Sequence, residues 1–461
     1  MLIDITVPAS PGWWLARLTH KLEDRRRRYD RLEAYYEGTS TPEILTSKAT
    51  RAAYQRLMGM ARTNFAELVV EAVRERMTVV GFRTGADGDE LGDREAWRIW
   101  QANALDADSD LVHRDALVMG DAYVIVGGVD DEIGAPVITP EDPRQVITEQ
   151  DPIRRRKAVA GLKLFHDDIA GLDRAYLYLP GVVYRATRKR RTDSTVYLQG
   201  LHGWEWEGAD NLPFDTIPVV RFALRGRKAS GEFEPHIPLL NRITDTVLHR
   251  MEVATLQAFR QRAIKGVPAF DENGVAIDYE DVFDNDPSAM WLLPESAEIW
   301  ESGQVDLGPI RQAIRDDIQD LAAVTRTPLF YLTPEAANGS AEGASLAREG
   351  LIFKAGDRIK QASEPWEQVL SIAFLIVGDL ERSSRRDMEA LWAPPERHSL
   401  AERADAASKL ANLVPWRTIQ STVLQFSPQE VDRMETERAM DAFMRPVQEV
   451  ADATTNDPPV S

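Results

Sequence analysis

The side chains that most often carry catalysis are present but scattered. The chain has seven histidines, with no spacing that places two on one helical face, and it contains no cysteine. His166, Asp167 and Asp168 form the nearest approach to a metal-binding cluster, but they follow a predicted strand and precede Gly171, which favours a turn. The sequence lacks a phosphate-binding loop, a dinucleotide fingerprint and the HExxH and GxSxG motifs. These residues therefore give no support for an enzyme.

Acidic residues dominate the charge balance. The 461 residues include 55 Lys and Arg against 74 Asp and Glu, a formal net charge of −19. Proteins that grip nucleic acid neutralise its phosphates with Lys and Arg, so we expect no tight DNA binding over the general surface. A like-charged wall would repel DNA and let it slide. Three basic runs, Arg25–Arg28, Arg154–Lys157 and Arg188–Arg191, are interpreted as solvated surface.

The length and composition predict a soluble protein with several substructures. A chain of this size usually forms about two to four of them. The longest near-apolar run is Val369–Val377, whereas a membrane span needs about 20 residues. Residues Met1–Pro11 lack the basic start and apolar stretch of a signal peptide. The absence of cysteine fits a reducing, intracellular place of synthesis.

In the N-terminal half, the spacing of apolar residues is first typical of helices and then typical of strands. Three/four spacing predicts helices over Trp13–Glu37, Asn64–Met77, Gly92–Asn103 and Ala107–Met119. Short apolar runs then predict a mostly antiparallel β layer over Ala122–Val129, Pro136–Thr139, Gln145–Thr148, Val159–Phe165, Ala175–Leu179, Val182–Ala186, Thr195–Leu198 and Ile217–Phe222.

Two long amphipathic helices follow and enclose a small insertion. The first is predicted to reach from Leu240 to Gly266, which is about 40 Å at 1.5 Å per residue. Gly266–Gln304 then carries short strands such as Met290–Leu293, and the second helix covers Leu307–Val324. We expect this hairpin to project one small lobe. The second helix has a polar side formed by Gln312, Arg315, Asp316 and Gln319.

The C-terminal part begins with a stretch of small and polar residues. Residues Thr333–Gly343 have no large side chain to anchor them, so we expect a mobile loop. A third long helix is predicted from Ala344 to Val377, bent or locally broken at Pro365. A helical tail should cover Leu400–Met444, interrupted near Pro415 and Pro428, and residues 446–461 should be disordered.

Nine short motifs follow one another along the chain. They are Tyr35–Gly38, Asn64–Val70, Arg76–Phe82, Trp100–Asp106, Gly120–Val124, Pro140–Pro143, Thr325–Pro328, Asn338–Ala344 and Trp392–Pro395. In this order, which is more specific than any one motif, they resemble the portal family, the head–tail connectors of tailed double-stranded-DNA bacteriophages. The resemblance runs from about residue 15 to 445 and is strongest to portals of long-tailed phages with actinobacterial or other Gram-positive hosts.

The resemblance implies an α+β portal fold with a helix-rich wing that carries an antiparallel β layer, long stem helices, a small α/β clip and a helical crown. Its implied parts are the wing (1–236), stem helix one (237–265), clip (266–306), stem helix two (307–326), tunnel loop region (327–343), long kinked helix and wing return (344–395), crown (396–445) and disordered tail (446–461).

The implied function is structural, without catalysis or cofactor. Copies would form a ring, usually dodecameric, at the unique capsid vertex of the virion, after assembly in the host bacterial cytoplasm. The ring would nucleate procapsid assembly and conduct double-stranded DNA during packaging and ejection, binding it weakly and without specificity. Its implied partners are the terminase large subunit (the ATPase motor), head completion or adaptor proteins, and the major capsid and scaffolding proteins, with no membrane.

The resemblance also assigns candidate positions in the channel. The tunnel loop would be Thr333, Pro334, Glu335, Ala336, Ala337, Asn338, Gly339, Ser340, Ala341, Glu342 and Gly343, which includes no Lys or Arg. The polar stem residues named above would line the channel. Arg348, Lys354, Arg358 and Lys360 would either contact DNA transiently or pair with Glu349 and Asp357 within the helix. Alternatives are another phage head or tail assembly or scaffold protein and, with less support, a metal-dependent nuclease, which would need clustered carboxylates.

Overall fold

The computed structural model describes residues 3–40, 58–86, 92–189, 203–224, 229–258, 262–267, 270, 274, 298–301, 303, 305–333, 341–396 and 399–455. The contacts divide the chain into two compact units. The larger unit comprises Met1–Ser40, Asn64–Pro238 and Leu321–Ser461, and the smaller one comprises Thr41–Thr63 and Leu239–Asp320.

Helices begin the larger unit close to their predicted places. They are α1 (Pro11–Tyr36), α3 (Phe65–Arg74), α4 (Arg94–Ala102) and α5 (Leu105–Met119). The Ser10 hydroxyl caps α1 by accepting a hydrogen bond from the Trp13 amide at 3.2 Å, and Gly38, with a φ of +68°, follows its C-terminus. Local capping and apolar spacing thus account for α1.

Every strand pairing among the described residues of the larger unit is antiparallel, as predicted, but the strands form three sheets instead of one layer. A three-stranded sheet has the order β3 (Ala135–Glu141), β2 (Asp121–Asp130), β9 (Val219–Ala223). A five-stranded sheet has the order β4 (Val146–Gln150), β5 (Ala158–Asp167), β6 (Leu172–Leu179), β7 (Val182–Lys189), β8 (Glu205–Asn211). The third sheet pairs β1 (Val79–Arg83) with β12 (Glu389–Trp392).

The edge strand β8 was missed by the sequence interpretation. Its residues Glu205–Asn211 are mostly exposed and polar, so they lack the apolar alternation that marks a half-buried strand. A polar edge also resists pairing with other chains. The predicted strand Thr195–Leu198 lies outside the described residues.

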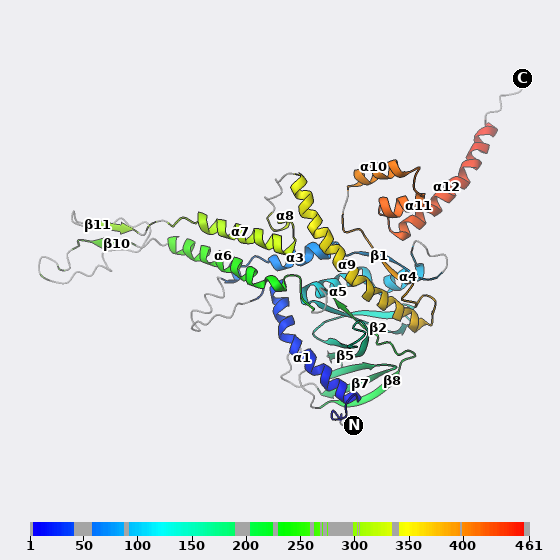
Figure 1. The fold of residues 1–461 in the computed structure, drawn as a ribbon, viewed down its shortest axis with the longest axis horizontal. Helices are drawn as coiled ribbons and strands as arrows, with labels where there is room; N and C mark the ends of the chain where they lie inside the picture. The colour runs from blue at the N-terminus through cyan, green and yellow to red at the C-terminus, as the bar shows by residue number, and fades with distance from the viewer. Residues whose placement is uncertain are drawn as a thin grey trace, which may run out of the picture. The chain divides into compact units, whose positions relative to one another are not determined.

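Helix α9 (Ala341–Val377) packs on β2, β3, β9 and β12 of the larger unit, and Figure 1 shows it as one continuous helix. Pro365 was predicted to bend or locally break this helix; the break is wrong, because the helix continues through it. The adjacent Trp366 is fully buried, with its ring centroid 4.9 Å from that of Trp100 and 4.8 Å from that of Phe222. This aromatic packing offsets the one backbone hydrogen bond that a proline removes.

Buried polar contacts fasten α1 to the three-stranded sheet. The Tyr29 hydroxyl donates to Asp121 at 2.9 Å, Arg221 Nε donates to the same carboxylate at 2.6 Å, and Arg25 donates to the Tyr123 hydroxyl at 3.1 Å. Burial, followed by the nearby Asp121 charge, raises the pKa of Tyr29. Since Arg28 also pairs with Glu234 at 2.6 Å, the Arg25–Arg28 run is not simply a solvated face.

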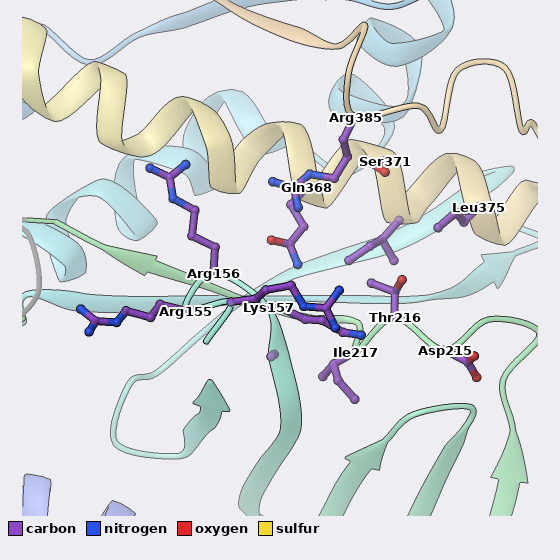
Figure 2. A pocket seen from close by; sticks show the side chains of 13 residues that line it. Arg155, Arg156, Lys157, Asp215, Thr216, Ile217, Gln368, Ser371, Leu375 and Arg385 are labelled. Carbon is purple, nitrogen blue, oxygen red and sulfur yellow. The ribbon is translucent and has the colours of Figure 1, made fainter. Parts of the chain in front are cut away.

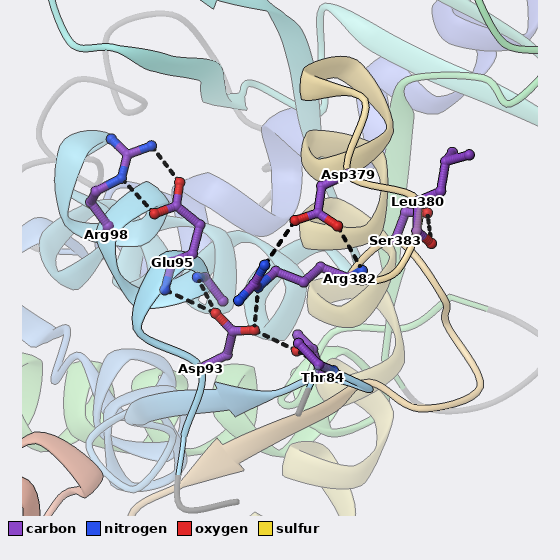
Figure 3. Close-up of polar contacts among 10 residues, drawn as sticks. Thr84, Asp93, Glu95, Arg98, Asp379, Leu380, Arg382 and Ser383 are labelled. Carbon is purple, nitrogen blue, oxygen red and sulfur yellow. Dashed lines mark hydrogen bonds and ion pairs between the residues drawn. The ribbon is translucent and has the colours of Figure 1, made fainter. Parts of the chain in front are cut away.

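The segment that follows α9 is tied to the start of α4 (Figure 3). The buried Asp93 caps α4 by accepting from the Glu95 and Ala96 amides, both at 2.9 Å. Arg382 Nε donates to the other oxygen of Asp93 at 2.9 Å, while Arg382 Nη1 donates to Asp379 at 3.0 Å. The Arg382 backbone amide also donates to Asp379, at 3.1 Å, and this bond together with the guanidinium bond holds the pKa of Asp379 below its usual range. One arginine thus joins two helix ends that are distant in the sequence.

His113 gives the larger unit a predictable dependence on pH. Its Nε2 accepts from Trp366 Nε1 at 2.9 Å, and burial lowers the pKa of His113 to about 3. As the pH falls from 6.5 towards 3, only the unfolded chain gains this proton, so His113 should reduce the free energy of unfolding by about 1.4 kcal/mol per pH unit. The His113→Gln variant keeps an acceptor without the titration.

Denaturant unfolding at pH 7 and pH 5 measures the effect. The loss of stability between the two pH values should be smaller in His113→Gln than in the unsubstituted protein. An equal loss in both would show that His113 does not contribute, because the carboxylates that also titrate in this range are common to both proteins.

The smaller unit contains most of a helical hairpin. Its elements are α6 (Ile237–Ala258), β10 (Arg262–Lys265), β11 (Glu298–Glu301) and α7 (Gly308–Thr325), and β10 pairs antiparallel with β11. The prediction that the first helix reaches Gly266 is wrong, since β10 occupies residues 262–265. The predicted strand Met290–Leu293 lies outside the described residues.

The C-terminal segment is helical and interrupted at the predicted prolines. It contains α10 (Leu400–Leu410), α11 (Trp416–Thr418), a π-helical turn, η3 (Ile419–Val423), and α12 (Pro428–Thr455). Ser399 and Glu402 form a capping box at the start of α10. Residues 446–461 were predicted to be disordered; α12 extends to Thr455, and residues 456–461 lie outside the described residues.

Candidate functional site

The two long helices of the hairpin lie side by side (Figure 1). Arg242 of α6 pairs with Asp317 of α7 at 2.7 Å and with Asp320 at 3.4 Å. Towards the other end of the pair, Gln257 Nε2 donates to the Val305 carbonyl at 2.9 Å. Polar contacts therefore hold the two helices together near both ends.

The polar stripe predicted on the second helix is exposed in the structure. Gln312, Arg315, Asp316 and Gln319 all lie on the solvent side of α7, whereas Ile314 and Ile318 are buried. Gln312 Nε2 donates to Asp316 at 2.8 Å, one helical turn away. This face carries amide and carboxylate groups together with Arg315.

The predicted tunnel loop falls largely outside the described residues. Thr333 is described, and its hydroxyl donates to the Leu329 carbonyl at 3.2 Å, just after the short helix α8 (Leu329–Leu332). Residues 334–340 are outside the description. The last three predicted loop residues, 341–343, already belong to α9, so the helix begins earlier than the predicted Ala344.

The four predicted DNA-contacting cations separate into two classes. Arg348 and Lys360 are exposed on α9, whereas Lys354 and Arg358 are only 7% and 8% exposed. Because Lys354 and Arg358 are buried, their charged groups are not accessible to the phosphates of DNA in this structure. Their expected alternative partners were Glu349 and Asp357, and Arg358 does contact Asp357.

The main partner of both buried cations is Glu232, which the sequence interpretation did not single out. Lys354 Nζ lies 3.2 Å from one carboxylate oxygen of Glu232, and Arg358 Nε donates to the other at 2.5 Å. Glu232 is 3% exposed. A buried carboxylate shared by two cations is a charged network that needs every member, because an unpaired charge in the interior is costly.

Lys354 also binds the end of α7. Its ammonium donates to the Thr325 carbonyl at 3.0 Å, and the Thr325 hydroxyl donates to the Leu321 carbonyl at 2.7 Å. Glu232 precedes α6, and Thr325 ends α7. All of these residues lie in the larger unit, where Lys354 joins the segment before α6 to the last residue of α7. We call Glu232, Thr325, Lys354 and Arg358 the hairpin anchor.

The motif Thr325–Pro328, which helped to carry the resemblance, has a structural role here. Thr325 and Thr327 are buried, and their hydroxyls lie 3.0 Å apart. Glu232 had no comparable signal, since it is one of 74 acidic residues and its partners are more than a hundred residues away. Only the tertiary structure brings this anchor together.

The described residues show no group of histidine, aspartate and glutamate side chains that could hold a metal ion. His166 is at the end of β5, where its Nδ1 lies 2.6 Å from the buried Asp173, and Asp167 caps the following turn. Asp173 also accepts from Arg188 at 2.7 Å, so Arg188 is buried instead of forming the expected surface turn. This part of the chain is thus a structural ion-pair network in the five-stranded sheet.

No helix in the described part of the chain is long and apolar enough to span a membrane.

Comparisons with known proteins agree with the ordered motifs. The family model described as "Phage portal protein, SPP1 Gp6-like" matches residues 15–443. The Portal protein of Mycobacterium phage L5 is 29% identical over 395 residues, which cover 82% of this chain and 77% of that relative. The Portal protein of Mycobacterium phage D29 is 28% identical over 419 residues, which cover 87% of this chain and 82% of that relative.

Proposed function

Because this chain belongs to the SPP1 Gp6-like family of phage portal proteins, we propose that its copies form a dodecameric ring at the unique vertex of the capsid. The ring is the channel through which double-stranded DNA enters during packaging and leaves during ejection. The family match over residues 15–443 is the observation that carries this proposal.

The exposed polar face of α7 supports a channel lined by the hairpin. One slim pair of amphipathic helices cannot cover all of its own faces, and side-by-side packing in a ring would cover the flanks. Gln312, Asp316 and Gln319 would then face the lumen with Arg315 beside them. A net charge of −19 favours weak contact with DNA over tight binding.

The protein acts passively in this proposal. The terminase large subunit docks on the clip, residues 266–306, and its ATPase supplies the work of packaging. Head completion or adaptor proteins bind there later, and the major capsid and scaffolding proteins meet the ring during assembly. No step requires the portal to catalyse a reaction.

Negative-stain electron microscopy of the purified full-length protein tests the ring. We expect closed rings with a central hole, viewed along their axis, and a sedimentation coefficient far above that of a single chain. Particles that remain solitary subunits at all concentrations, without a hole, would overturn the proposal.

Single cysteines test which face of α7 lines the channel. Because the chain has no native cysteine, Gln312→Cys, Asp316→Cys and Gln319→Cys can be labelled selectively in assembled rings. A small maleimide should label all three, whereas a polymer-linked maleimide too wide for the channel should not. Asp131→Cys, in an exposed turn, is the control that both reagents should label. Equal labelling of all positions by the wide reagent would place the stripe on the outside.

A further inference from the structure

The larger unit has a cavity of about 540 Å³ between the turn that joins β4 to β5 and the C-terminal half of α9 (Figure 2). The basic run Arg154–Lys157 forms one side of it. Gln368, Ile372 and Leu375 of α9 form another side, and Arg385 comes from the segment after α9. The proposed channel function makes no use of this cavity.

The charge of the cavity is opposite to that of the chain. Five cations line it, four from the turn and Arg385, against one lining carboxylate, Asp215. Arg156 and Arg385 share Glu364, at 2.7 and 3.4 Å, and all five cations are exposed. In a protein of net charge −19, this cluster forms a local positive site.

Hydrogen bonds made by Asp151 hold the turn in a fixed conformation. The Asp151 carboxylate accepts from the Ile153 and Arg154 amides, both at 2.8 Å, and the Asp151 amide donates to the Lys157 carbonyl at 2.8 Å. These amide hydrogen bonds lower the pKa of Asp151. The cations are therefore displayed on a preorganised turn, which reduces the entropy lost when they bind a partner.

The lining is also partly apolar. Three large apolar side chains line it: Ile217 and Ile372 are buried, and Leu375 is half-buried. Outside the lining, Ile153 projects from the basic turn with 90% of its surface exposed. A phosphate ligand would pair with the cations but would gain nothing from these apolar groups. An acidic peptide that also carries leucine-like side chains would match both the charge and the apolar lining.

We propose that this cavity binds an acidic linear segment, with apolar side chains among its carboxylates, from a partner protein. The carboxylates pair with Arg154, Arg155 and Lys157, and an apolar side chain enters towards Ile372 and Leu375. The proposal depends on the larger unit alone and is independent of the channel.

Fluorescence anisotropy with the full-length protein tests this site. The probe is a short fluorescein-labelled peptide of alternating glutamate and leucine, and the variant is Arg155→Glu/Lys157→Glu. We expect the variant to bind about tenfold more weakly at low salt, since two attractive charges become repulsive. The control Arg27→Glu/Lys189→Glu makes the same change in net charge at two other exposed cations and should bind like the unsubstituted protein.

Two further probes test whether the site needs apolar side chains in its ligand and whether it prefers a peptide to phosphate groups. A peptide with serine in place of leucine should bind more weakly than the leucine peptide, and a short labelled DNA duplex should bind more weakly than either. Equal affinity of all proteins for the leucine peptide would overturn the proposal, as would equal weakening in both double variants. Tighter binding of the duplex, lost in Arg155→Glu/Lys157→Glu, would replace it with a phosphate site.

Discussion

Replacing Glu232 by glutamine should lower the free energy of unfolding by about 3–5 kcal/mol, the cost of leaving a buried charge without its partner. Glutamine has nearly the same shape, but it cannot neutralise Lys354 and Arg358, which are both buried against Glu232. Chemical denaturation of the full-length protein measures the change.

Two comparisons make this result specific to the hairpin anchor. Glu349→Gln removes the same charge from an exposed position of α9 and should change stability by no more than about 0.5 kcal/mol. Adding Lys354→Met and Arg358→Met to Glu232→Gln should recover part of the loss, because replacing both cations by apolar side chains removes the unpaired buried charges. A single Glu232→Gln variant as stable as the unsubstituted protein would show that the anchor does not stabilise the fold.

Deleting Ala336–Ser340 should leave ring formation intact and reduce the DNA retained in particles to a small fraction. The deletion ends before α9 begins at Ala341, so it spares that helix. The resemblance to portals assigns Thr333–Gly343 as the tunnel loop, and we propose that this loop narrows the channel and holds DNA by steric blockage, not by electrostatic attraction. Nuclease-protected DNA in particles and negative-stain images of rings are the two readouts.

The matched control separates size from charge. Glu335→Gln/Glu342→Gln keeps the full length of the loop while it removes both carboxylates, so particles should retain DNA normally. Normal retention after the deletion would reject the loop as the constriction. A comparable loss in the charge variant would mean that acidity, not bulk, controls passage.

Local patterns predicted most of the helices and strands because their causes lie in neighbouring residues. Apolar spacing and a serine cap define α1, and alternating apolar residues define the central strands. The family predicted from the order of the motifs is confirmed by the match over residues 15–443. The end of α6 was predicted wrongly, because the pairing of β10 with β11 depends on residues beyond the helix.

The candidate site was harder to predict because its geometry is tertiary. Lys354 and Arg358 have the same side-chain types and nearly the same spacing as exposed cations on a helix, and only packing against Glu232 distinguishes them. The exposed stripe on α7 could be predicted, because an amphipathic helix determines its own polar side. Which of these faces meets DNA remains a prediction for the cysteine experiment.

The hairpin anchor gives the chain a modular architecture. Since Glu232 and Thr325 both bind Lys354, the polypeptide leaves and re-enters the larger unit at one point. The entropic cost of closing the chain segment between these two residues grows only slowly with its length, by about 0.6 kcal/mol per doubling. This segment could therefore be shortened, extended or exchanged for the corresponding segment of another portal with little effect on the rest of the fold, provided that the graft junctions lie between Glu232 and Thr325 of the hairpin anchor.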